Sequence, residues 1–346
     1  MADPIVSLTL IQTIAALVSL IISGVVTYIL VPPLIDKMKK RKITGSDWNK
    51  KDKPEIPELG GIAILFGFPV GISIAAGILK LFDVLPSAPI LAAIGVIFIA
   101  GMIGIIDDIS DISKKVKAFG VAFAALPLLL AGFGNADIAL PFGYYIDLTS
   151  IDLVYWLILV PIGITGAANA MNMSAGYNGL ETGQVAVISF SLLICAIIAG
   201  TNIQCILILS ALLGASIGLN YFNGFPAVVF VGNVGTFALG AGIGIGAIVG
   251  GLEFAGIIAI APAFYEVFAT VYYSLFRRVD SESRKKAHSR PIIDEDGKLH
   301  APKGAEKYKL SLLILGKKPM KEKDLVRTIL SMYLIFGVIA IILEAL

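Results

Sequence analysis

Long apolar runs recur along the chain and set the first expectation about its fold. A helix needs about 20 mostly apolar residues to cross the hydrocarbon core of a bilayer. Ten runs of roughly this length can be counted, separated by shorter polar connections. The pattern therefore predicts an all-α polytopic membrane protein with about ten transmembrane helices. The predicted spans are 8–31, 60–82, 88–106, 118–134, 151–172, 184–200, 203–222, 236–252, 254–276 and 326–344.

The composition supports this expectation. Hydrophobic residues make up 57% of the 346 residues and charged residues 15%, which leaves too little polar surface for a soluble protein of this size. The longest polar segment, 277–325, is too short for a separate soluble domain, so we expect residues 1–346 to form a single transmembrane domain. Within that segment, the Asp296-Gly297 pair predicts the turn of a small β-hairpin.

Basic residues are confined almost entirely to three connections, and this orients the predicted spans. The segments 36–58, 107–117 and 277–327 hold eight, three and fifteen Lys and Arg residues, which is 26 of the 27 in the chain. With ten spans, all three segments fall on the same side of the membrane. Because cytoplasmic loops carry an excess of Lys and Arg, we expect this side to be cytoplasmic and both termini to lie outside.

A cluster of carboxylates follows the third span. Asp107 and Asp111 are four residues apart, and Asp108 and Asp111 are three apart, so a continued helix would bring them onto adjoining faces. Carboxylates this close repel one another unless a cation compensates. Hard oxygen donors suit Mg²⁺, and the nearby Lys117 suits a phosphate. A solvated helix end with balanced charge is the alternative interpretation.

Amide side chains and glycines gather after the fifth span. Asn169 and Asn172 share one helical face, and Gly176 and Gly179 then weaken the helix. Glycine lets the backbone approach a ligand closely, and Asn offers both a donor and an acceptor. The stretch favours a nucleobase or sugar site that includes Glu181. A capped helix followed by an ordinary turn is the alternative, and it explains one Asn but not the whole group.

Two further polar clusters face the same predicted side. Gly232 and Asn233 lie at the loop-to-helix junction that leads into the eighth span, where backbone N–H groups could receive an anion. Arg290, beside His288, lies in the last basic loop, most of which is explained by topology and by attraction to anionic lipid. Acidic, amide and basic clusters on one face indicate a cytoplasmic site for a phosphorylated, metal-bound ligand that is rich in hydrogen bonds.

The order of these motifs resembles the polyprenyl-phosphate N-acetylhexosamine-1-phosphate transferase family, of the glycosyltransferase 4 type. It is especially similar to the archaeal and eukaryotic dolichyl-phosphate GlcNAc-1-phosphotransferase branch. Four stretches carry the resemblance, in the same order and over nearly the whole chain. They are "ITGSDWNKKDKPEIPE", "DDISDISKKVK", "NAMNMSAGYNGLETGQ" and "VFVGNVGTFALGA".

The resemblance implies an enzyme that transfers N-acetylglucosamine 1-phosphate from UDP-GlcNAc to a polyprenyl phosphate of the dolichyl type. UMP would leave, in the first step of lipid-linked oligosaccharide synthesis for protein N-glycosylation. The same reaction with another UDP-N-acetylhexosamine or with undecaprenyl phosphate is an alternative. A transporter is a less favoured alternative. The polar residues of a transporter should lie at the membrane midplane on broken, repeated helices, whereas here they cluster at one surface. The implied partners are UDP-GlcNAc, the polyprenyl phosphate and the bilayer. A homodimer is left open, and no nucleic acid is expected.

The resemblance also assigns roles to individual positions. Asp107 and Asp108 would organise the lipid phosphate and the metal, and Lys117 would bind phosphate. Asn172 and Asn233 would hold Mg²⁺, for which Mn²⁺ is an alternative. The substrate-binding residues would be Gly176, Asn178 and Phe230 at the uracil, Trp48 and Glu58 near the nucleoside, and His288 and Arg290 at the pyrophosphate or N-acetyl group. The polar clusters themselves, apart from the resemblance, add Asp111, Asn169 and Glu181 to the predicted substrate-binding residues.

One position departs from the family pattern, because Asn233 stands where the family usually has Asp. An amide oxygen can coordinate Mg²⁺ but brings no negative charge. If Asn172 and Asn233 are both ligands, the substrate diphosphate must supply most of the charge. We therefore expect weak metal affinity without nucleotide. A catalytically inactive relative is the alternative.

The expected chemistry leaves two routes open. A phosphate monoester has a second pKa of about 6, so the lipid phosphate is largely dianionic at neutral pH and needs little help from a base. Direct in-line attack, with Asp107 positioning the groups, is favoured; a covalent phospho-aspartate at Asp107 is the alternative.

Glu266, inside the ninth span, would line a lipid groove or serve as a buried packing partner. We expect a multi-pass protein of an archaeal-type cell membrane, or of the ER membrane if the source is a eukaryote. Its active site is expected on the cytoplasmic side.

Overall fold

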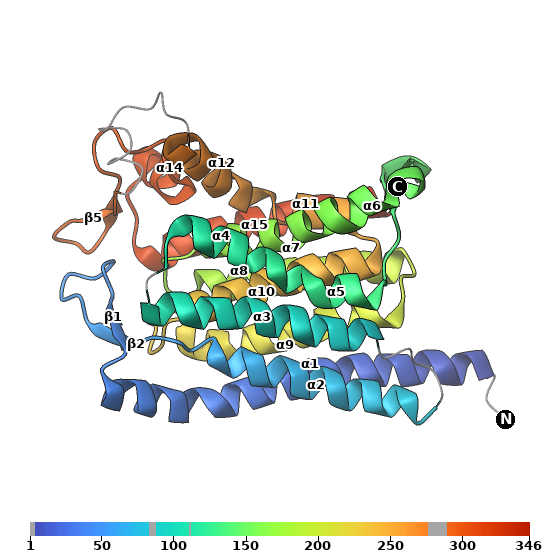
Figure 1. The fold of residues 1–346 in the computed structure, drawn as a ribbon. Helices are drawn as coiled ribbons and strands as arrows, with labels where there is room; N and C mark the ends of the chain where they lie inside the picture. The colour runs from blue at the N-terminus through green and yellow to red at the C-terminus, as the bar shows by residue number, and fades with distance from the viewer. Residues whose placement is uncertain (1–3, 83–87, 111, 276–288) are drawn as a thin grey trace.

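The computed structural model describes residues 4–82, 88–110, 112–275 and 289–346 and shows a bundle of helices that run along a common direction (Figure 1). Within the described residues, eight helices are long and apolar enough to cross a membrane, which confirms the all-α polytopic fold. They are α1 (Pro4–Arg41), α2 (Ile62–Lys80), α3 (Ala88–Ser110), the stretch Thr149–Met173 that ends in α7 (Val160–Met173), α8 (Leu180–Ile198), α9 (Ile203–Asn223), α10 (Gly232–Gly250) and α15 (Glu322–Glu344).

The expected count of ten spans is not confirmed, because two predicted spans are interrupted helices. In the segment 254–276, as far as it is described, the helix ends at Ala259 and restarts at Ala261. Pro262 lies in the first turn of the new helix, where its missing N–H costs nothing, but it cannot continue the preceding helix. The two pieces are α11 (Glu253–Ala259) and α12 (Ala261–Leu275).

The second interrupted segment is 118–134. Its longest apolar helical stretch, Phe119–Ala131, falls short of a full crossing. Gly132 then adopts φ +56°, a left-handed conformation that ends the helix at little cost for glycine. The pieces are α4 (Lys114–Ala122), η1 (Phe123–Ala125) and α5 (Leu126–Ala131).

Helix α1 is longer than a membrane requires. Its 38 residues would extend about 57 Å at about 1.5 Å per residue, against a hydrocarbon core of about 30 Å. Lys39, Lys40 and Arg41 occupy its last turn, where cations interact favourably with the helix dipole. The basic end of α1 therefore projects beyond the apolar bundle and leads into the first polar loop.

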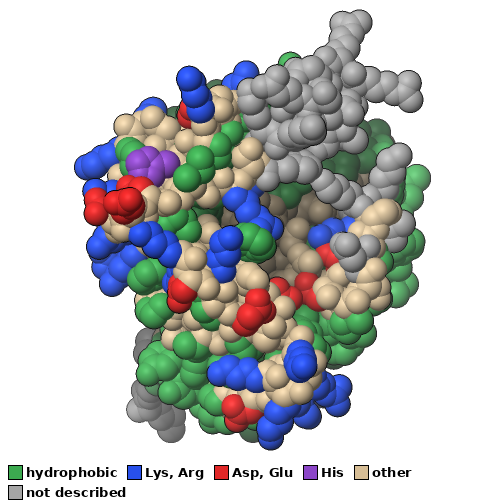
Figure 2. All heavy atoms as spheres, turned by 90° about the vertical axis from the view of Figure 1, so that its left-hand side faces the viewer, with side chains coloured by type: hydrophobic (Ala, Val, Ile, Leu, Met, Phe, Trp, Pro, Cys, Tyr) green, Lys and Arg blue, Asp and Glu red, His purple; other side chains and the backbone are tan. Residues whose placement is uncertain are grey.

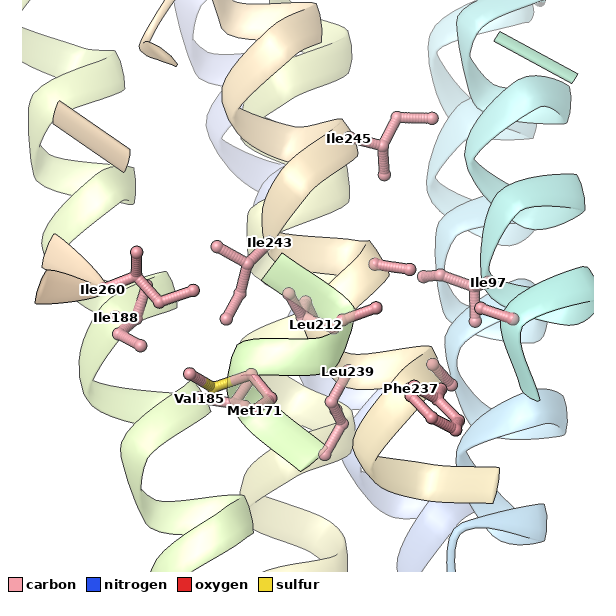
Figure 3. Packing of buried hydrophobic residues seen from close by; sticks show 14 of the residues in the cluster. Ile97, Met171, Val185, Ile188, Leu212, Phe237, Leu239, Ile243, Ile245 and Ile260 are labelled. Carbon is pink, nitrogen blue, oxygen red and sulfur yellow. The ribbon is translucent and has the colours of Figure 1, made fainter. Parts of the chain in front are cut away.

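Helix α10 forms the centre of the bundle. It is the most buried of the candidate spanning helices, and it packs against α3, α7 and α9. Figure 3 shows Phe237, Leu239 and Ile243 of α10 among Ile97 of α3 and Leu212 of α9. A helix that is apolar on all sides is suited to such a place, so α10 holds its first turn at a fixed position.

Helices α1 and α9 pack closely because glycines let their backbones approach. A Cβ atom added at Gly214 would lie 2.0 Å from the carbonyl oxygen of Leu20, and one added at Gly218 would lie 2.4 Å from that of Gly24. Small residues at helix contacts are a common way to associate helices in lipid, where burial of apolar surface drives little association.

In the part of the chain that the structure describes, three short antiparallel hairpins and several short helical turns complete the fold. The hairpin predicted around Asp296-Gly297 is confirmed, with Ile292 opposite His300. Two other hairpins were not predicted. The remaining elements are β1 (Thr44–Ser46), β2 (Glu55–Pro57), β3 (Asp137–Ala139), η2 (Pro141–Gly143), β4 (Tyr145–Asp147), η3 (Thr149–Ile151), α6 (Asp152–Val154), η4 (Tyr155–Leu159), β5 (Ile292–Ile293), β6 (Leu299–His300) and α14 (Leu310–Lys317).

The two ends of the bundle differ. The β1–β2 hairpin, β5 and α14 lie at one end, whereas α1 begins and α15 ends at the other (Figure 1). This arrangement agrees with a same-side location of both ends of the chain, opposite the basic loops. That the loop end faces the cytoplasm stays a prediction from the charge distribution.

Candidate active site

A cavity of about 440 Å³ opens at the loop end of the bundle. Figure 2 shows this end, with acidic and basic side chains around a hollow. Segments far apart in the sequence form its walls: the β1–β2 loop, the end of α3, the turn between α7 and α8, the start of α10, and parts of α12, α14 and α15. Because the spanning helices hold these segments, the cavity has a rigid base and loops at its rim.

Asp108 fixes the position of the first turn of α10. Its two carboxylate oxygens accept hydrogen bonds from the backbone N–H groups of Asn233 and Val234, at 3.0 Å and 3.1 Å. The first N–H groups of a helix lack partners within the helix, and the helix dipole favours a negative charge there. The helix start that the sequence predicted as an anion site therefore binds the protein's own carboxylate.

Glycines make this contact between α3 and α10 possible. A Cβ atom at Gly104 of α3 would lie 2.4 Å from the backbone oxygen of Asn233. Gly232 has φ +73°, and a Cβ atom there would lie 2.9 Å from the Asp108 carboxylate. Any larger residue at either position would push the carboxylate and the helix start apart.

Asp107 lies behind this contact and not on the cavity wall. Its Oδ2 atom accepts a hydrogen bond from the Asn233 side-chain amide at 2.6 Å and forms an ion pair with Lys117. The Asp107 side chain is only 4% exposed. Asp107 and Lys117 thus neutralise each other and orient Asn233 from behind.

Asn172 and Asn233 meet at the end of α7. The Asn172 side-chain nitrogen donates to Asn233 Oδ1 at 2.5 Å and to the Thr236 hydroxyl at 2.9 Å. The sequence analysis required Asp108, Asn172 and Asn233 to share one pocket, and all three line this cavity. Their proposed roles stay predictions.

The oxygen-bearing side chains of the cavity decide whether the expected Mg²⁺ fits there. Within the described residues, no group of three or more Asp, Glu, His or Cys side chains could hold a metal ion. Around Asn172 and Asn233, the proposed oxygen donors are their two neutral amides and Asp108, which already accepts two backbone N–H bonds. These residues fit a cation that takes most of its oxygen ligands from a bound phosphate.

The glycine-rich turn after α7 lies against the cavity and is held from both sides. Gly176 has φ +121°, which strongly favours glycine; its N–H donates to Glu181 Oε1 at 2.8 Å, and its carbonyl accepts from Asn49 Nδ2 at 2.8 Å. Phe230 lines the cavity and is fixed by its N–H bond to the Pro57 carbonyl at 2.8 Å. The turn therefore offers backbone groups to a ligand, and Phe230 before α10 offers an aromatic ring.

A buried polar network that the sequence analysis missed anchors the first loop. Asp47 Oδ2 accepts from Lys50 at 2.5 Å and from the Asn178 side chain at 3.2 Å, and Lys50 also donates to Asn178 Oδ1 at 2.9 Å. Glu322, at the start of α15, accepts the Asn178 N–H at 2.8 Å. The side chain of Asn178, predicted to bind uracil, is thus engaged by protein groups, although the residue lines the cavity.

The members of this network differ in how clearly the sequence points to them. Asp47 and Lys50 stand in the stretch "GSDWNK" that carried the resemblance, so their position beside the site could have been expected. Glu322 stands among lysines before the last span and shows no motif. Its role depends on a contact 144 residues away in the chain, with Asn178.

Trp48 and Arg290 stack across the rim of the cavity. The Arg290 guanidinium carbon lies 4.2 Å from the centre of the Trp48 ring, and the Lys53 ammonium lies 4.7 Å from it. Cations are attracted to the face of an indole ring. This contact joins the first loop to the last one and keeps a guanidinium at the rim.

Glu58 is the other acid contributed by the first loop. Burial raises the pKa of its carboxyl group, and the neighbouring carboxylates of Asp108 and Glu55 raise it further. The carboxyl group therefore retains its proton to a higher pH than that of an exposed Glu.

Ten of the fifteen residues predicted for the site line the cavity. Asp107 and Lys117 lie directly behind it. Asn169 does not reach it, because its side-chain amide donates to the Thr165 carbonyl at 2.9 Å on its own helix. Asp111 and His288 lie outside the described residues. The ten are Trp48, Glu58, Asp108, Asn172, Gly176, Asn178, Glu181, Phe230, Asn233 and Arg290.

Comparison with known proteins identifies related chains. The model of Glycosyl transferase family 4 matches residues 90–251. A protein of Saccharolobus solfataricus named "Putative UDP-N-acetylglucosamine--dolichyl-phosphate N-acetylglucosaminephosphotransferase" is 33% identical over 96% of this chain and 98% of its own length. A Sulfolobus acidocaldarius protein of the same name is 29% identical over 97% and 98%. The phospho-N-acetylmuramoyl-pentapeptide-transferase of Desulforamulus reducens is 29% identical over 66% and 72%.

The network around Asp47 yields a testable prediction. Lys50→Met removes the cation that neutralises Asp47, whose side chain is 1% exposed, and should destabilise the first loop by about 1–3 kcal/mol. We expect a lower melting temperature in detergent and faster proteolysis within 44–57. Lys40→Met, at the exposed end of α1, is the control. Asp47→Asn combined with Lys50→Met should recover part of the loss. Equal behaviour of Lys50→Met and Lys40→Met would contradict the assignment.

Proposed function

Because the chain belongs to glycosyl transferase family 4, we propose that it transfers N-acetylglucosamine 1-phosphate from UDP-GlcNAc to a polyprenyl phosphate of the dolichyl type. An oxygen of the lipid phosphate attacks the β-phosphorus of UDP-GlcNAc, the bond from that phosphorus to the bridging oxygen breaks, and UMP leaves. The product is polyprenyl-diphospho-GlcNAc. Two of the archaeal relatives that match nearly the whole chain carry names for this reaction.

The observation that carries the proposal is the meeting of Asp108, Asn172, Asn233 and Arg290 in one cavity at an end of a membrane bundle. A lipid phosphate keeps its hydrocarbon tail in the bilayer, so its reaction partner must bind at the membrane surface. The cavity is polar and lies where the spanning helices end, which suits a nucleotide sugar that arrives from water. The distribution of Lys and Arg supports a cytoplasmic location for this end.

The arrangement of Asp107 supports direct attack and not a covalent intermediate. A nucleophilic carboxylate must reach the phosphorus, but Asp107 is buried, does not line the cavity, and its Oδ2 atom is engaged by Asn233 and Lys117. The lipid phosphate is itself largely dianionic near neutral pH and needs no activation by a covalent step. Asp107 then acts by positioning the Asn233 amide.

Magnesium is part of the proposal. When bound, it would neutralise charge on the diphosphate and on the leaving UMP. Asn172 and Asn233 would hold it with their amide oxygens, beside the Asp108 carboxylate. Because both amides are neutral, the diphosphate supplies most of the negative charge around the cation.

The first prediction for this function concerns transfer itself. With UDP-GlcNAc, dolichyl phosphate and Mg²⁺, the purified protein should release UMP, and Asn172→Ala should lower kcat about a hundredfold because an aligned polar contact is lost at the reacting groups. Asn135→Ala, at the opposite end of the bundle, is the matched control. UDP-GalNAc and UDP-glucose test the sugar, and undecaprenyl phosphate tests the lipid. A wild-type protein that releases no UMP from any pair would refute the proposal.

The second prediction separates the two chemical routes. Asp107→Asn preserves the size of the side chain but cannot form a phospho-aspartate. Under direct attack this variant should keep measurable turnover, reduced about 10- to 100-fold because the ion pair with Lys117 and the orientation of Asn233 are weakened. Initial rates of UMP release measure it. Turnover indistinguishable from the uncatalysed rate, in a variant that still binds UDP, would favour the covalent route.

The third prediction concerns the cation. Titration calorimetry of the purified protein with Mg²⁺ alone should show weak binding, in the millimolar range or above, because the Asn172 and Asn233 amides add no charge. Mg²⁺ should strengthen UDP binding in the same preparation. Asn233→Asp should strengthen binding of Mg²⁺ without nucleotide. Micromolar Mg²⁺ affinity of the wild-type protein without UDP would contradict this account.

A further inference from the structure

The cavity wall carries many more acids than cations. Of the described residues that line it, five have carboxyl groups and two have cationic side chains. Lys117, the lysine that the sequence analysis chose for phosphate, lies behind the wall in its ion pair with Asp107. A diphosphate placed in this cavity must therefore lie beside the two cations. The acids are Asp47, Glu58, Asp108, Glu181 and Glu266, and the cations are Arg290 and Lys309.

Lys309 is held in the cavity and not displayed on the surface. It occupies the position before the first residue of α14, is half-buried, and lines the cavity. Its ammonium donates to the Ser289 carbonyl at 3.3 Å, next to Arg290. A lysine ammonium has three N–H donors, so after this bond two can reach a ligand. The same bond brings Lys309 and Arg290 to the same side of the cavity.

Glu266 accounts for the position of Lys309. This residue of α12 is 8% exposed, and its Oε1 atom accepts the backbone N–H of Leu310 at 2.8 Å. The bond fixes the start of α14, and with it the backbone of Lys309. Burial lowers the pKa of Lys309, and the Glu266 carboxylate opposes that effect, so the acid also supports the charged form of the lysine.

We propose that Lys309 binds a phosphate oxygen of the nucleoside diphosphate beside Arg290, and that Glu266 is the residue that positions it. The inference rests on the proposed function for the identity of the ligand. It adds a substrate-binding lysine that lies in no stretch carrying the family resemblance, and it gives the buried acid of α12 a defined task. A surface lysine would face water, whereas this one faces the cavity.

The test compares UDP with uridine, which lacks both phosphates. Calorimetric titrations at one Mg²⁺ concentration should show that Lys309→Met lowers UDP affinity about 10- to 100-fold, as expected for loss of a charge-assisted hydrogen bond. Uridine affinity, measured by competition, should change less than about twofold. Lys309→Arg should stay within about fivefold of wild type for UDP. Lys307→Met, two residues earlier and exposed, is the matched control and should bind as wild type does.

Glu266 is tested by conservative replacement. Glu266→Ala should lower UDP affinity and spare uridine, because α14 loses its fixed start. Glu266→Gln keeps an oxygen that can accept the Leu310 N–H, and it should restore much of the UDP affinity. Equal affinities for UDP in Glu266→Gln and Glu266→Ala would overturn the positioning role.

Other outcomes also decide the matter. If Lys309→Met binds UDP as wild type does, or loses UDP and uridine equally, the contact with phosphate is wrong. Unchanged UDP affinity with a raised KM for dolichyl phosphate would assign the lysine to the lipid phosphate and overturn the nucleotide contact. If the wild-type protein binds UDP with the predicted Lys309 dependence but transfers nothing, the proposed function fails and the inference stands. A wild-type protein that does not bind UDP would overturn both.

Discussion

The bond between the Asp108 carboxylate and the first N–H groups of α10 is the contact on which the site depends. It joins the end of α3 to the start of α10, at 3.0 Å and 3.1 Å, and satisfies N–H groups that have no partner in their own helix. With α10 fixed, Asn233 faces Asn172 on one side and Asp107 on the other. The buried body of α10 keeps this geometry from relaxing, since its apolar surface packs against α3, α7 and α9.

Charges are then distributed in two layers. Behind the wall, Lys117 and Asp107 neutralise each other, and at the edge Lys50 neutralises Asp47. Facing the cavity, carboxyl groups outnumber cations. The lysines of these two ion pairs are therefore not available to bind a ligand. Among the described residues, the cations that line the cavity and can bind an anion are Arg290 and Lys309. This division explains why a lysine chosen from its sequence motif is not on the wall.

Apolar periodicity and motif spacing predicted the architecture and the centre of the site. They identified the eight long helices, the hairpin at Asp296-Gly297, and the meeting of Asp108 with Asn172 and Asn233. Hydropathy could not show that a helix breaks before Pro262, because a broken helix and a continuous one have the same apolar content. Nor could it find Lys309 and Glu322, whose places in the site depend on contacts with residues 20 and 144 positions away.

Neutral amides and an excess of acids have a further consequence for how ligands bind. A divalent cation alone would meet two amides and a carboxylate that already accepts two hydrogen bonds, and a diphosphate alone would meet several carboxyl groups. If the proposed Mg²⁺ binds here, each ligand would improve the site for the other, and by thermodynamic linkage the improvement would be equal in both directions. A site built in this way would bind the proposed cation more weakly without the nucleotide. Asn233, which stands where the family usually has an aspartate, would strengthen that dependence, because its neutral amide leaves Asp108 as the carboxylate beside the proposed cation.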